Sequence, residues 1–405
     1  GKHCKGRGFS VLFCEAVHSL LRGRSKHNMA FTIGVPAETE TGETRVALIP
    51  DVARSLIEKY GCEVVVESGA GQAAYAPDAA FEAAGAHVAE RAEVFAADLL
   101  LKVQPPASNE IDQMRSGQTL IGFLAPLDQP EVARQLAEKG VTALAMELVP
   151  RISRAQKMDA LSAMSSLGGY RAVLVAAHAL PRFFPLLTTA AGTIKPANVM
   201  VIGAGVAGLQ AIATAKRLGA HVAGYDIRPA VREEVESLGA GFIELQLDAE
   251  DTQTEGGYAK ELQQEIQERQ PELLKPYIEA ADVVVTTALI PGRPAPLLIN
   301  EAAVEAMTPG SVIVDLAAPN GGNCALTETG QTITAHAVHV HGPTNLPAEM
   351  PMHASRLYAR TLSAMVEEFM SDDDAFMLDF DDEIIEGACV AHEGKIVNDR
   401  LKELV

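Results

Sequence analysis

Cysteine is scarce in this sequence of 405 residues, and no two cysteines stand in a C-x-x-C pair. Zinc sites and disulfide-exchange sites often use such a pair, so the sequence gives no reason to expect a metal site. Scattered thiols favour a reducing, cytosolic compartment. The five cysteines are Cys4, Cys14, Cys62, Cys324 and Cys389.

Positive charge is also in short supply. The chain has 33 Lys and Arg against 53 Asp and Glu, which gives a formal net charge of −20. Such a chain repels nucleic-acid phosphates and anionic lipids, so we expect no nucleic-acid partner. The acidic residues cluster once, in Ser371–Asp382. A metal site is one interpretation of this cluster, but apolar residues such as Phe376 and Phe380 separate the carboxylates and favour a solvated loop.

A long uninterrupted apolar run is the third missing feature. The most apolar region, Ala172–Ile194, falls short of the ~20 apolar residues that a bilayer span needs. It is interrupted by His178, Pro181, Arg182 and Pro185. We therefore expect no direct membrane span.

Residues 1–28 precede Met29 and are rich in Lys and Arg. Such a stretch is either an organelle-targeting peptide or an extraneous, disordered N-terminal extension. Because the regular pattern of the chain begins only after Met29, we favour the second interpretation.

From Phe31 onward, short β-branched runs alternate with helical stretches. Strands are predicted at Phe31–Pro36, Glu63–Glu67, Leu99–Val103, Leu120–Leu124 and Thr142–Leu148. Helices are predicted at Val52–Tyr60, Ala79–Ala84 and Pro130–Lys139. This alternation is typical of a largely parallel sheet with helices on both faces, that is, a doubly wound α/β domain.

A second strand–helix series starts at Val199 and predicts a separate domain. Its further strands are expected near His221–Tyr225, Phe242–Leu245, Asp282–Thr287, Ser311–Asp315 and Thr332–Val340. Two apolar-periodic helices, Ser165–Phe184 and Met352–Met370, would carry the chain into this domain and back. The predicted fold is therefore α/β, with two doubly wound parallel-sheet (Rossmann-like) domains and a ligand cleft between them. The first domain is discontinuous, with residues 29–164 and 346–405, and the second is a Rossmann domain of residues 165–345.

A glycine-rich turn follows the first strand of the second series. The sequence Gly203-Ala-Gly205-Val206-Ala207-Gly208 is a G-x-G-x-x-G motif between an apolar strand and a helix. In this context the first glycine permits a tight turn, the second admits a pyrophosphate, and the third lets the helix pack close to the strand. The phosphates would lie at the positive end of a helix that begins near Val206.

The next strand ends at Asp226, at about the ~20-residue spacing expected after the glycines. A carboxylate here accepts hydrogen bonds from the adenosine ribose hydroxyls, which favours NAD(H) over NADP(H). Arg228 is the counter-argument, because a nearby arginine can bind a 2′-phosphate. We expect NAD(H) as the cofactor, with Asp226, Ile227 and Arg228 beside its adenosine.

Two later strands end in residues that could line the ligand. In an open α/β sheet, ligands bind at the carboxyl ends of the strands, which makes Leu289 and Asp315 candidates. Core packing explains Leu289 equally well.

Further motifs lie along the whole chain. They are Gly34-Val-Pro-Ala-Glu38, Thr44-Arg-Val-Ala-Leu-Ile-Pro50, Pro150-Arg-Ile-Ser-Arg-Ala-Gln-Lys-Met-Asp159, Ala190-Ala-Gly-Thr193, Thr287-Ala-Leu-Ile-Pro-Gly292 and Gly321-Gly-Asn323. With these motifs, Phe31–Val405 resembles the NAD(H)-binding component of the proton-translocating NAD(P) transhydrogenases, which is similar throughout to alanine dehydrogenase.

The resemblance implies an activity and an assembly. The component would pass hydride from NADH to NADP⁺ held on an NADP(H)-binding partner subunit, and a membrane-embedded subunit would couple this transfer to proton translocation. The resemblance also implies a homodimer in the cytoplasm, peripheral at the inner membrane through its partner subunits.

The same resemblance assigns roles in the segment that follows Pro150. Arg151, Asp159 and Ser162 would hold the nicotinamide carboxamide, and Gln156 would position the ring. Taken without the resemblance, Arg151 and Asp159 are expected to form a surface ion pair. Hydride transfer needs two aligned rings rather than an acid or a base, so positioning of this kind would be the catalytic device.

A polar stretch, Asp248–Glu255, and the glycines after it resemble the mobile loop of the family. Gly257 and Tyr258 would then contact the bound nucleotide as parts of a lid. An ordinary flexible surface loop fits this composition almost as well.

Two basic residues, Arg45 and Lys102, match substrate-binding residues of alanine dehydrogenase. However, Ile121–Pro126 lacks that enzyme's histidine acid/base, and Ala317–Asn320 lacks its aspartate. Amination of a keto acid needs proton transfer, so we do not expect this activity, and Arg45 and Lys102 would be structural relics or interface residues. The alternatives are an alanine dehydrogenase-type enzyme and a non-catalytic NAD-sensing module.

Overall fold

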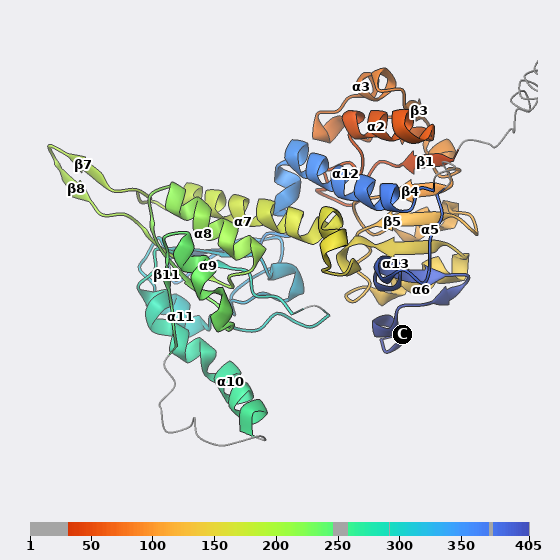
Figure 1. Cartoon of the computed structure of the whole chain (residues 1–405). Helices are drawn as coiled ribbons and strands as arrows, with labels where there is room; N and C mark the ends of the chain where they lie inside the picture. Colours follow the sequence, from red (N-terminus) through yellow and green to blue (C-terminus); the bar gives the residue numbers. More distant parts are fainter. Residues whose placement is uncertain (1–30, 246–257, 291, 372–375, 405) are drawn as a thin grey trace, which may run out of the picture.

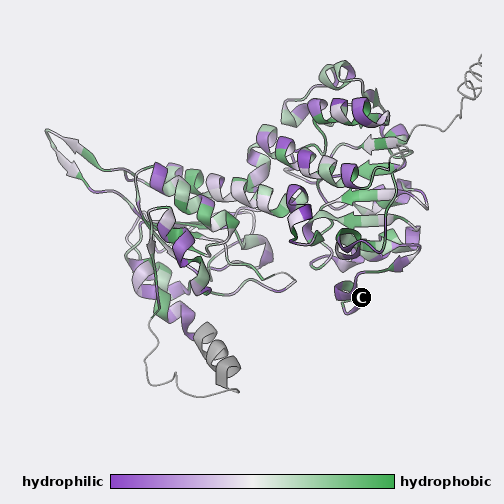
Figure 2. Ribbon diagram, in the orientation of Figure 1, coloured by the Kyte–Doolittle hydropathy of each residue, from purple (hydrophilic) through white to green (hydrophobic). Residues whose placement is uncertain are grey.

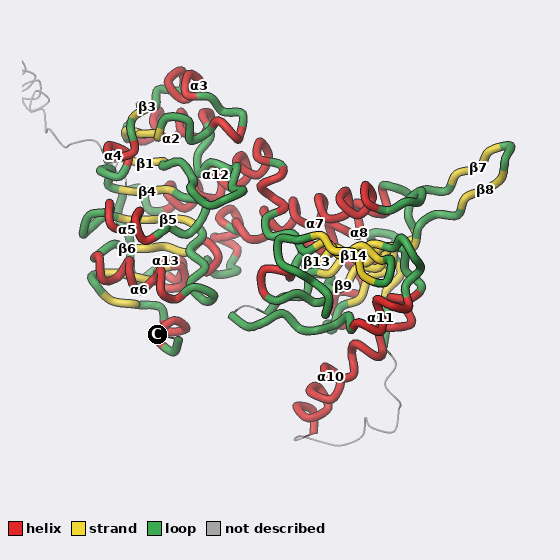
Figure 3. Tube along the Cα trace, turned by 180° about the vertical axis from the view of Figure 1, so that it is seen from behind, coloured by secondary structure: helices red, strands yellow, loops and turns green. Residues whose placement is uncertain are grey.

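The computed structural model describes residues 31–245, 258–290, 292–371 and 376–404. Figure 1 shows two α/β domains side by side, with the long helix α7 (Ala160–Ala179) running from one to the other. Figure 3 shows the same arrangement from behind. The predicted fold class, with two doubly wound domains of which the first is discontinuous, is confirmed.

The first sheet has eight strands in the order β17-β16-β6-β5-β4-β1-β2-β3. Strands β1 to β6 run parallel to one another, in the spatial order β3-β2-β1-β4-β5-β6 that is typical of doubly wound domains. Two C-terminal strands extend the sheet antiparallel beyond β6. The bounds are β1 Thr32–Val35, β2 Glu63–Glu67, β3 His87–Ala89, β4 Leu99–Leu101, β5 Thr119–Gly122, β6 Thr142–Ala145, β16 Cys389–His392 and β17 Lys395–Ile396.

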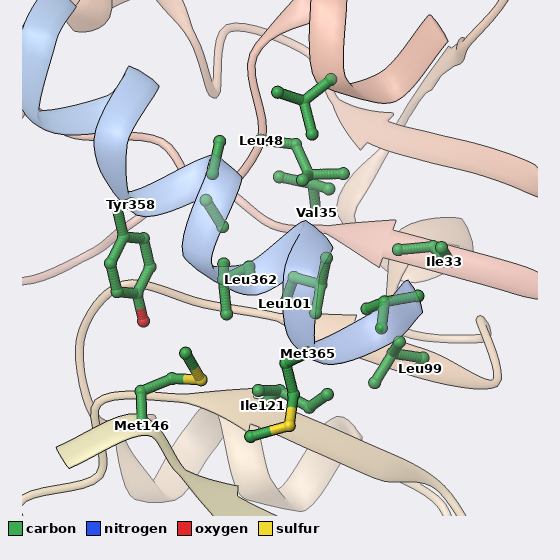
Figure 4. Packing of buried hydrophobic residues seen from close by; sticks show 14 of the residues in the cluster. Ile33, Val35, Leu48, Leu99, Leu101, Ile121, Met146, Tyr358, Leu362 and Met365 are labelled. Atoms are coloured by element: carbon green, nitrogen blue, oxygen red, sulfur yellow. The ribbon is translucent and has the colours of Figure 1, made fainter. Parts of the chain in front are cut away.

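Helices cover both faces of this sheet. They are α2 (Pro50–Tyr60), α3 (Asp78–Ala83), α4 (Arg91–Val94), α5 (Ser108–Gln113), α6 (Pro130–Lys139), α12 (Pro351–Glu368), α13 (Glu383–Ala388) and α14 (Asp399–Lys402). Local sequence sets both ends of two of these helices: α2 and α6 each begin with proline and end at a glycine with positive φ. Figure 4 shows α12 packed on the sheet, with Leu362 and Met365 against Leu99, Leu101 and Ile121.

The second sheet has seven strands in the order β11-β10-β9-β12-β13-β15-β14. All but the edge strand β14 run parallel. The strands are β9 Asn198–Ile202, β10 His221–Tyr225, β11 Gly241–Phe242, β12 Val283–Thr286, β13 Val312–Asp315, β14 Thr332–Ala335 and β15 Val338–His341. The helices are α8 (Val206–Arg217), α9 (Arg232–Ser237), α10 (Tyr258–Glu279) and α11 (Glu301–Ala306). Figure 2 shows hydrophobic residues concentrated in the strands of the first domain and hydrophilic ones on its outer helices.

Several predicted elements differ from the structure. The single strand expected at Thr332–Val340 is a hairpin, because His336 and Ala337 adopt positive φ and reverse the chain. The connecting helix was expected at Ser165–Phe184 but spans Ala160–Ala179. A projecting hairpin, β7 (Leu187–Thr189) with β8 (Gly192–Ile194), had not been predicted (Figure 1).

Helix α7 bears on the expectation about membrane spans. Within the described residues it is the one helix that is long and apolar enough to cross a bilayer by length and composition. Its apolar surface has another use here, because it packs closely against α8. A Cβ atom on Gly169 would lie 2.0 Å from the carbonyl oxygen of Ala207, so only glycine permits this approach.

Candidate functional site

The glycine turn lies at the point where the strand order of the second sheet reverses, between β9 and β12. Gly203 has φ +94°, and a Cβ on Gly208 would lie 1.7 Å from the carbonyl oxygen of Gly203. Thr287, at the end of β12, donates a hydrogen bond of 3.0 Å to the same oxygen. The turn is therefore held against its neighbours by glycines that no other residue can replace without movement.

Gly205 has different surroundings. A Cβ atom on it would meet no atom of the described residues within 4 Å. It occupies the N-cap position of α8 but has no side chain to accept a hydrogen bond, so the first N–H groups of this helix have no side-chain cap. Open space beside an uncapped helix N-terminus is the geometry that accepts a pyrophosphate.

Asp226 follows β10 and faces this turn. Its Oδ2 accepts a hydrogen bond of 2.8 Å from the Ala204 amide, and its Oδ1 accepts one of 2.9 Å from the Arg228 amide. The guanidinium of Arg228 donates to both oxygens, at 2.9 and 3.0 Å. Burial alone would raise the pKa of Asp226, but the bonds from Arg228 and Ala204 lower it, so the side chain is a carboxylate. Arg228 is thus engaged by Asp226 instead of standing free for a 2′-phosphate.

Three exposed apolar side chains come from the strand ends and the helix start around the turn. Val206 is 42% exposed, and Ile227 and Leu289 are each 51% exposed. The interpretation of Leu289 as a packed core residue is therefore wrong. Apolar surfaces of this kind suit the faces of aromatic rings.

Asp315 does not line a ligand site. The residue is fully buried, and its carboxylate accepts hydrogen bonds from side chains and backbone of its own domain. The donors are Thr286, Ala317, Asn323, Cys324 and Thr327. The sequence correctly placed Asp315 at a strand end, but its role is to organise the loops after β12 and β13.

The four residues assigned to the nicotinamide lie together in the first domain, at the start of α7. Asp159 is the N-cap of α7: its Oδ1 accepts from the Ser162 amide at 2.8 Å and its Oδ2 from the Ser162 hydroxyl at 2.6 Å. The expected ion pair between Arg151 and Asp159 is absent from the described residues. Arg151 and Gln156 are exposed and have no side-chain partner within the described part of the chain.

Residues between these four hold the segment in place. Arg154 pairs with Asp382 at 2.7 Å and with Glu368 at 3.2 Å, and Lys157 pairs with Glu368 at 2.8 Å. These partners lie more than 200 residues away in the sequence, so no local signal pointed to them. Asp382 is thereby engaged in an ion pair and, through Ile384, in the N-cap of α13.

The first sheet has its own strand-order reversal, between β1 and β4, and the chain itself fills it. Glu38, after β1, accepts a hydrogen bond of 2.6 Å from the Val103 amide. Its Oε2 also lies 3.1 Å from Nζ of Lys102, a side chain that is fully buried. A second carboxylate, Glu110, contacts Lys102 at 3.2 Å. Here burial raises the pKa of Glu38 while Lys102 opposes the rise.

Arg45 lies beside this cluster and is also neutralised. Glu43 binds it through two side-chain bonds of 2.7 and 2.6 Å and also accepts from Gln104 and Asn345. These bonds outweigh burial and lower the pKa of Glu43 to about 2. The expectation that Arg45 and Lys102 are interface residues is wrong, because both are buried in structural ion pairs.

Some predicted features lie outside the described residues. These are residues 1–28, the polar stretch Asp248–Glu255, Gly257, the side chain of Tyr258, and Asp372, Asp373 and Asp374 of the acidic cluster. Among the residues that are described, no three His, Cys, Asp or Glu side chains are placed to hold a metal ion. The structure thus groups Gly203, Gly205, Gly208, Asp226 and Arg228 in the second domain, and Arg151, Gln156, Asp159 and Ser162 in the first.

The chain as a whole is similar to several known proteins. Residues 34–168 match the family described as alanine dehydrogenase/PNT, N-terminal domain, and residues 172–399 match its C-terminal domain. An NAD(P) transhydrogenase subunit alpha polypeptide of Rhodospirillum rubrum is 45% identical over 91% of this chain and 98% of its own length. The crystal structure of transhydrogenase from Sinorhizobium meliloti has a TM-score of 0.81 and 40% identity, and covers 90% of this chain and 100% of that one. Alanine dehydrogenase of Mycolicibacterium smegmatis is 31% identical over 82% of this chain and 85% of its own length.

Proposed function

This chain belongs to the alanine dehydrogenase/PNT family, and on that premise we propose that it is the NAD(H)-binding component of an NAD(P) transhydrogenase. It would pass hydride from NADH to NADP⁺ on a partner subunit, and a membrane-embedded partner would couple the transfer to proton translocation. The relatives named as subunit alpha support a multi-subunit assembly. The chain itself would be cytoplasmic and would lie at the inner membrane through those partners.

The contrast between the two strand-order reversals carries this proposal. The reversal in the second domain has open space beside Gly205, whereas Glu38 and Lys102 fill the one in the first domain. A keto acid would need free basic groups for its carboxylate, and both candidates, Arg45 and Lys102, are already neutralised. An open glycine turn, together with the lack of free basic groups for a keto acid, fits hydride exchange between nucleotides.

Within the proposed site, each end of NADH would have its own residues. Gly203, Gly205 and Gly208, with Val206 and Ala207, would hold the pyrophosphate, while Asp226, Ile227 and Arg228 would hold the adenosine. Arg151 and Gln156 are exposed polar groups of the nicotinamide segment without a side-chain partner among the described residues, and they would orient the ring with Leu289. Asp159 and Ser162 would act with them while capping α7. When bound, NADH supplies the hydride, and these residues supply only alignment.

A homodimer is part of the proposal. The hairpin β7–β8 projects from the second domain in Figures 1 and 3. Its flanks expose Phe183, Leu186 and Ile194 at 50%, 60% and 48%, beside a cavity of about 660 Å³ at the hairpin base. Exposed apolar groups on a projecting arm suit burial against a second copy, which sedimentation equilibrium would detect.

Replacement of Gln156 tests the function and the nicotinamide segment together. In the complex assembled with its NADP(H)-binding and membrane subunits, Gln156→Ala should slow single-turnover hydride transfer by on the order of a hundredfold, because misalignment of the rings costs rate. NADH affinity of the isolated chain should change little, because pyrophosphate and adenosine contacts remain.

The matched control is Gln72→Ala. Gln72 is also exposed and also lies in a short 3₁₀ helix of the first domain. It should leave both measurements unchanged. A parent-like transfer rate in Gln156→Ala would contradict the assigned role of the segment, and absence of transfer in the assembled parent complex would contradict the proposed function.

A further inference from the structure

Three consecutive backbone amides at the end of β5 are bound by side chains. Phe123 donates to the hydroxyl of Tyr358 at 3.1 Å, and Leu124 and Ala125 both donate to Oε1 of Glu147, at 2.9 and 2.5 Å. Ala125 has φ +47°, a conformation that alanine rarely adopts. A short turn is therefore held in an unfavourable backbone conformation mainly by one carboxylate.

This turn reaches from the first domain to the second. The Ala125 carbonyl accepts from the amides of Asp128 and Gln129, at 3.0 and 2.7 Å, which closes the turn. Asp128 accepts a bond of 3.4 Å from Asn320. A Cβ on Gly292 would lie 3.4 Å from the Cβ of Leu127, in ordinary contact. We call Leu124–Asp128 the interdomain turn.

Glu147 itself lies in the short helix Met146–Leu148 after β6. Four residues further on the chain reaches Arg151 and the nicotinamide segment. The backbone between them lies close to α13. A Cβ atom on Gly387 of this helix would lie 3.1 Å from Cδ of Pro150 and 3.3 Å from the carbonyl oxygen of Leu148. The Glu147 side chain thus links the interdomain turn to the residues that directly precede the nicotinamide segment.

The second carboxylate oxygen of Glu147 is in an unfavourable environment. Oε2 of Glu147 is buried and has no hydrogen-bond partner among the described residues. Burial raises the pKa of Glu147 to about 7, and Asp128 in the turn adds to the rise. Tyr358 on α12 is the other titratable group that interacts with it. An unsatisfied buried oxygen in a well-packed domain needs an explanation beyond stability.

We propose that Glu147 is a positioning residue for hydride transfer, which holds the interdomain turn and the Arg151–Ser162 segment in one arrangement without touching the nucleotide. This inference rests on the proposed function. It predicts that Glu147 affects the transfer step and not nucleotide affinity, because its carboxylate is used by backbone amides of the turn.

The test compares three variants in the assembled complex. Glu147→Ala removes both hydrogen bonds and should slow single-turnover transfer by at least about tenfold, with NADH affinity within about twofold of the parent. Glu147→Gln keeps an oxygen acceptor at the same reach and should restore the rate to within about threefold. Glu58→Ala, at an exposed glutamate of α2 without a side-chain partner among the described residues, is the control and should behave as the parent.

Parent-like transfer in Glu147→Ala would overturn the inference, and so would an equal loss in affinity and in rate. If Glu147→Ala does not fold, Glu147→Asp replaces it, because the shorter side chain keeps the charge but lacks the reach. It should be slow as well, and a parent-like rate would again overturn the inference.

A measurement on the isolated chain separates this inference from the proposed function. Amide hydrogen exchange at Leu124 and Ala125 should be faster than in the parent in Glu147→Ala and parent-like in Glu147→Gln. Unchanged exchange in Glu147→Ala overturns the inference even if the complex transfers hydride. Failure of the parent complex to transfer hydride refutes the function, whatever the exchange shows.

Discussion

Gly205 and Gly208 lie three residues apart in one turn, yet alanine at these positions should have different effects. A Cβ on Gly205 meets nothing within 4 Å, whereas one on Gly208 lies 1.7 Å from the Gly203 carbonyl oxygen. The second substitution must separate these atoms by more than about 1 Å to reach normal contact. We therefore expect Gly208→Ala to destabilise the domain and Gly205→Ala to leave it intact.

The sizes of the effects follow from these contacts. Overpacking costs about 1–3 kcal/mol, and each kcal/mol lowers the Tm of a domain of this size by about 2–4 °C. Gly208→Ala should therefore melt roughly 2–12 °C below the parent. In Gly205→Ala the methyl group occupies space that the pyrophosphate needs. Loss of one charge-assisted hydrogen bond, about 1.5–3 kcal/mol, would weaken NADH binding roughly 10- to 150-fold.

Thermal unfolding without nucleotide, followed by circular dichroism, measures the first effect, and fluorescence titration with NADH measures the second. Gly168→Ala in α7 is the control, because its Cβ also meets nothing within 4 Å among the described residues and it is not part of the turn. It should bind NADH normally and melt no lower than the parent. Parent-like NADH affinity in Gly205→Ala would refute the assignment of the pyrophosphate site. A parent-like Tm in Gly208→Ala would refute the close packing of the turn.

Three further predictions concern charge. NADH should bind much more tightly than NADPH, and Asp226→Asn should reduce this preference about tenfold, because it removes the charge that repels a 2′-phosphate; equal affinities of the parent for both nucleotides in a fluorescence titration would exclude this role. The purified chain should show no NADH oxidation with pyruvate and ammonium, because Arg45 and Lys102 are already paired, and a saturable rate would contradict the transhydrogenase assignment. The pKa of Glu147 is raised from 4.5 to about 7, so its contribution to stability is complete below pH 4.5 and is lost as the pH rises through 7. Between these values the unfolding free energy of the parent should fall by roughly 3 kcal/mol relative to Glu147→Gln, and parallel denaturant curves across this range would show that the carboxyl is not perturbed.

The sequence alone predicted the parts of this protein that depend on neighbouring residues. Short apolar runs located β2 and β10 to the residue, and Pro130 and Gly140 bounded α6. The glycine spacing placed the turn before α8, and the structure places Asp226 beside it. Each of these signals is a local steric or hydrophobic preference, so it can be seen within about 20 residues.

Other features depended on residues that are distant in the sequence. The hairpin β14–β15 was missed because two non-glycine residues with positive φ make its turn, and neither carries the usual glycine signal. The capping role of Asp159 was hidden because the helix was expected to begin five residues later. Arg154 and Lys157 gain their partners only when the C-terminal part of the chain returns to the first domain.

The tertiary structure also decided which of two similar sites is open. From the sequence, Arg45 and Lys102 matched basic residues of a substrate site whose histidine this chain lacks, and the glycine turn matched a nucleotide site. Glu43, two residues away, binds Arg45, and packing brings Glu38 and Glu110 onto Lys102, whereas no described residue lies within 4 Å of a Cβ on Gly205. A charge in a sequence is available to a ligand only if no other part of the chain neutralises it. That outcome depends on contacts between residues up to 64 positions apart, which only the folded chain brings together.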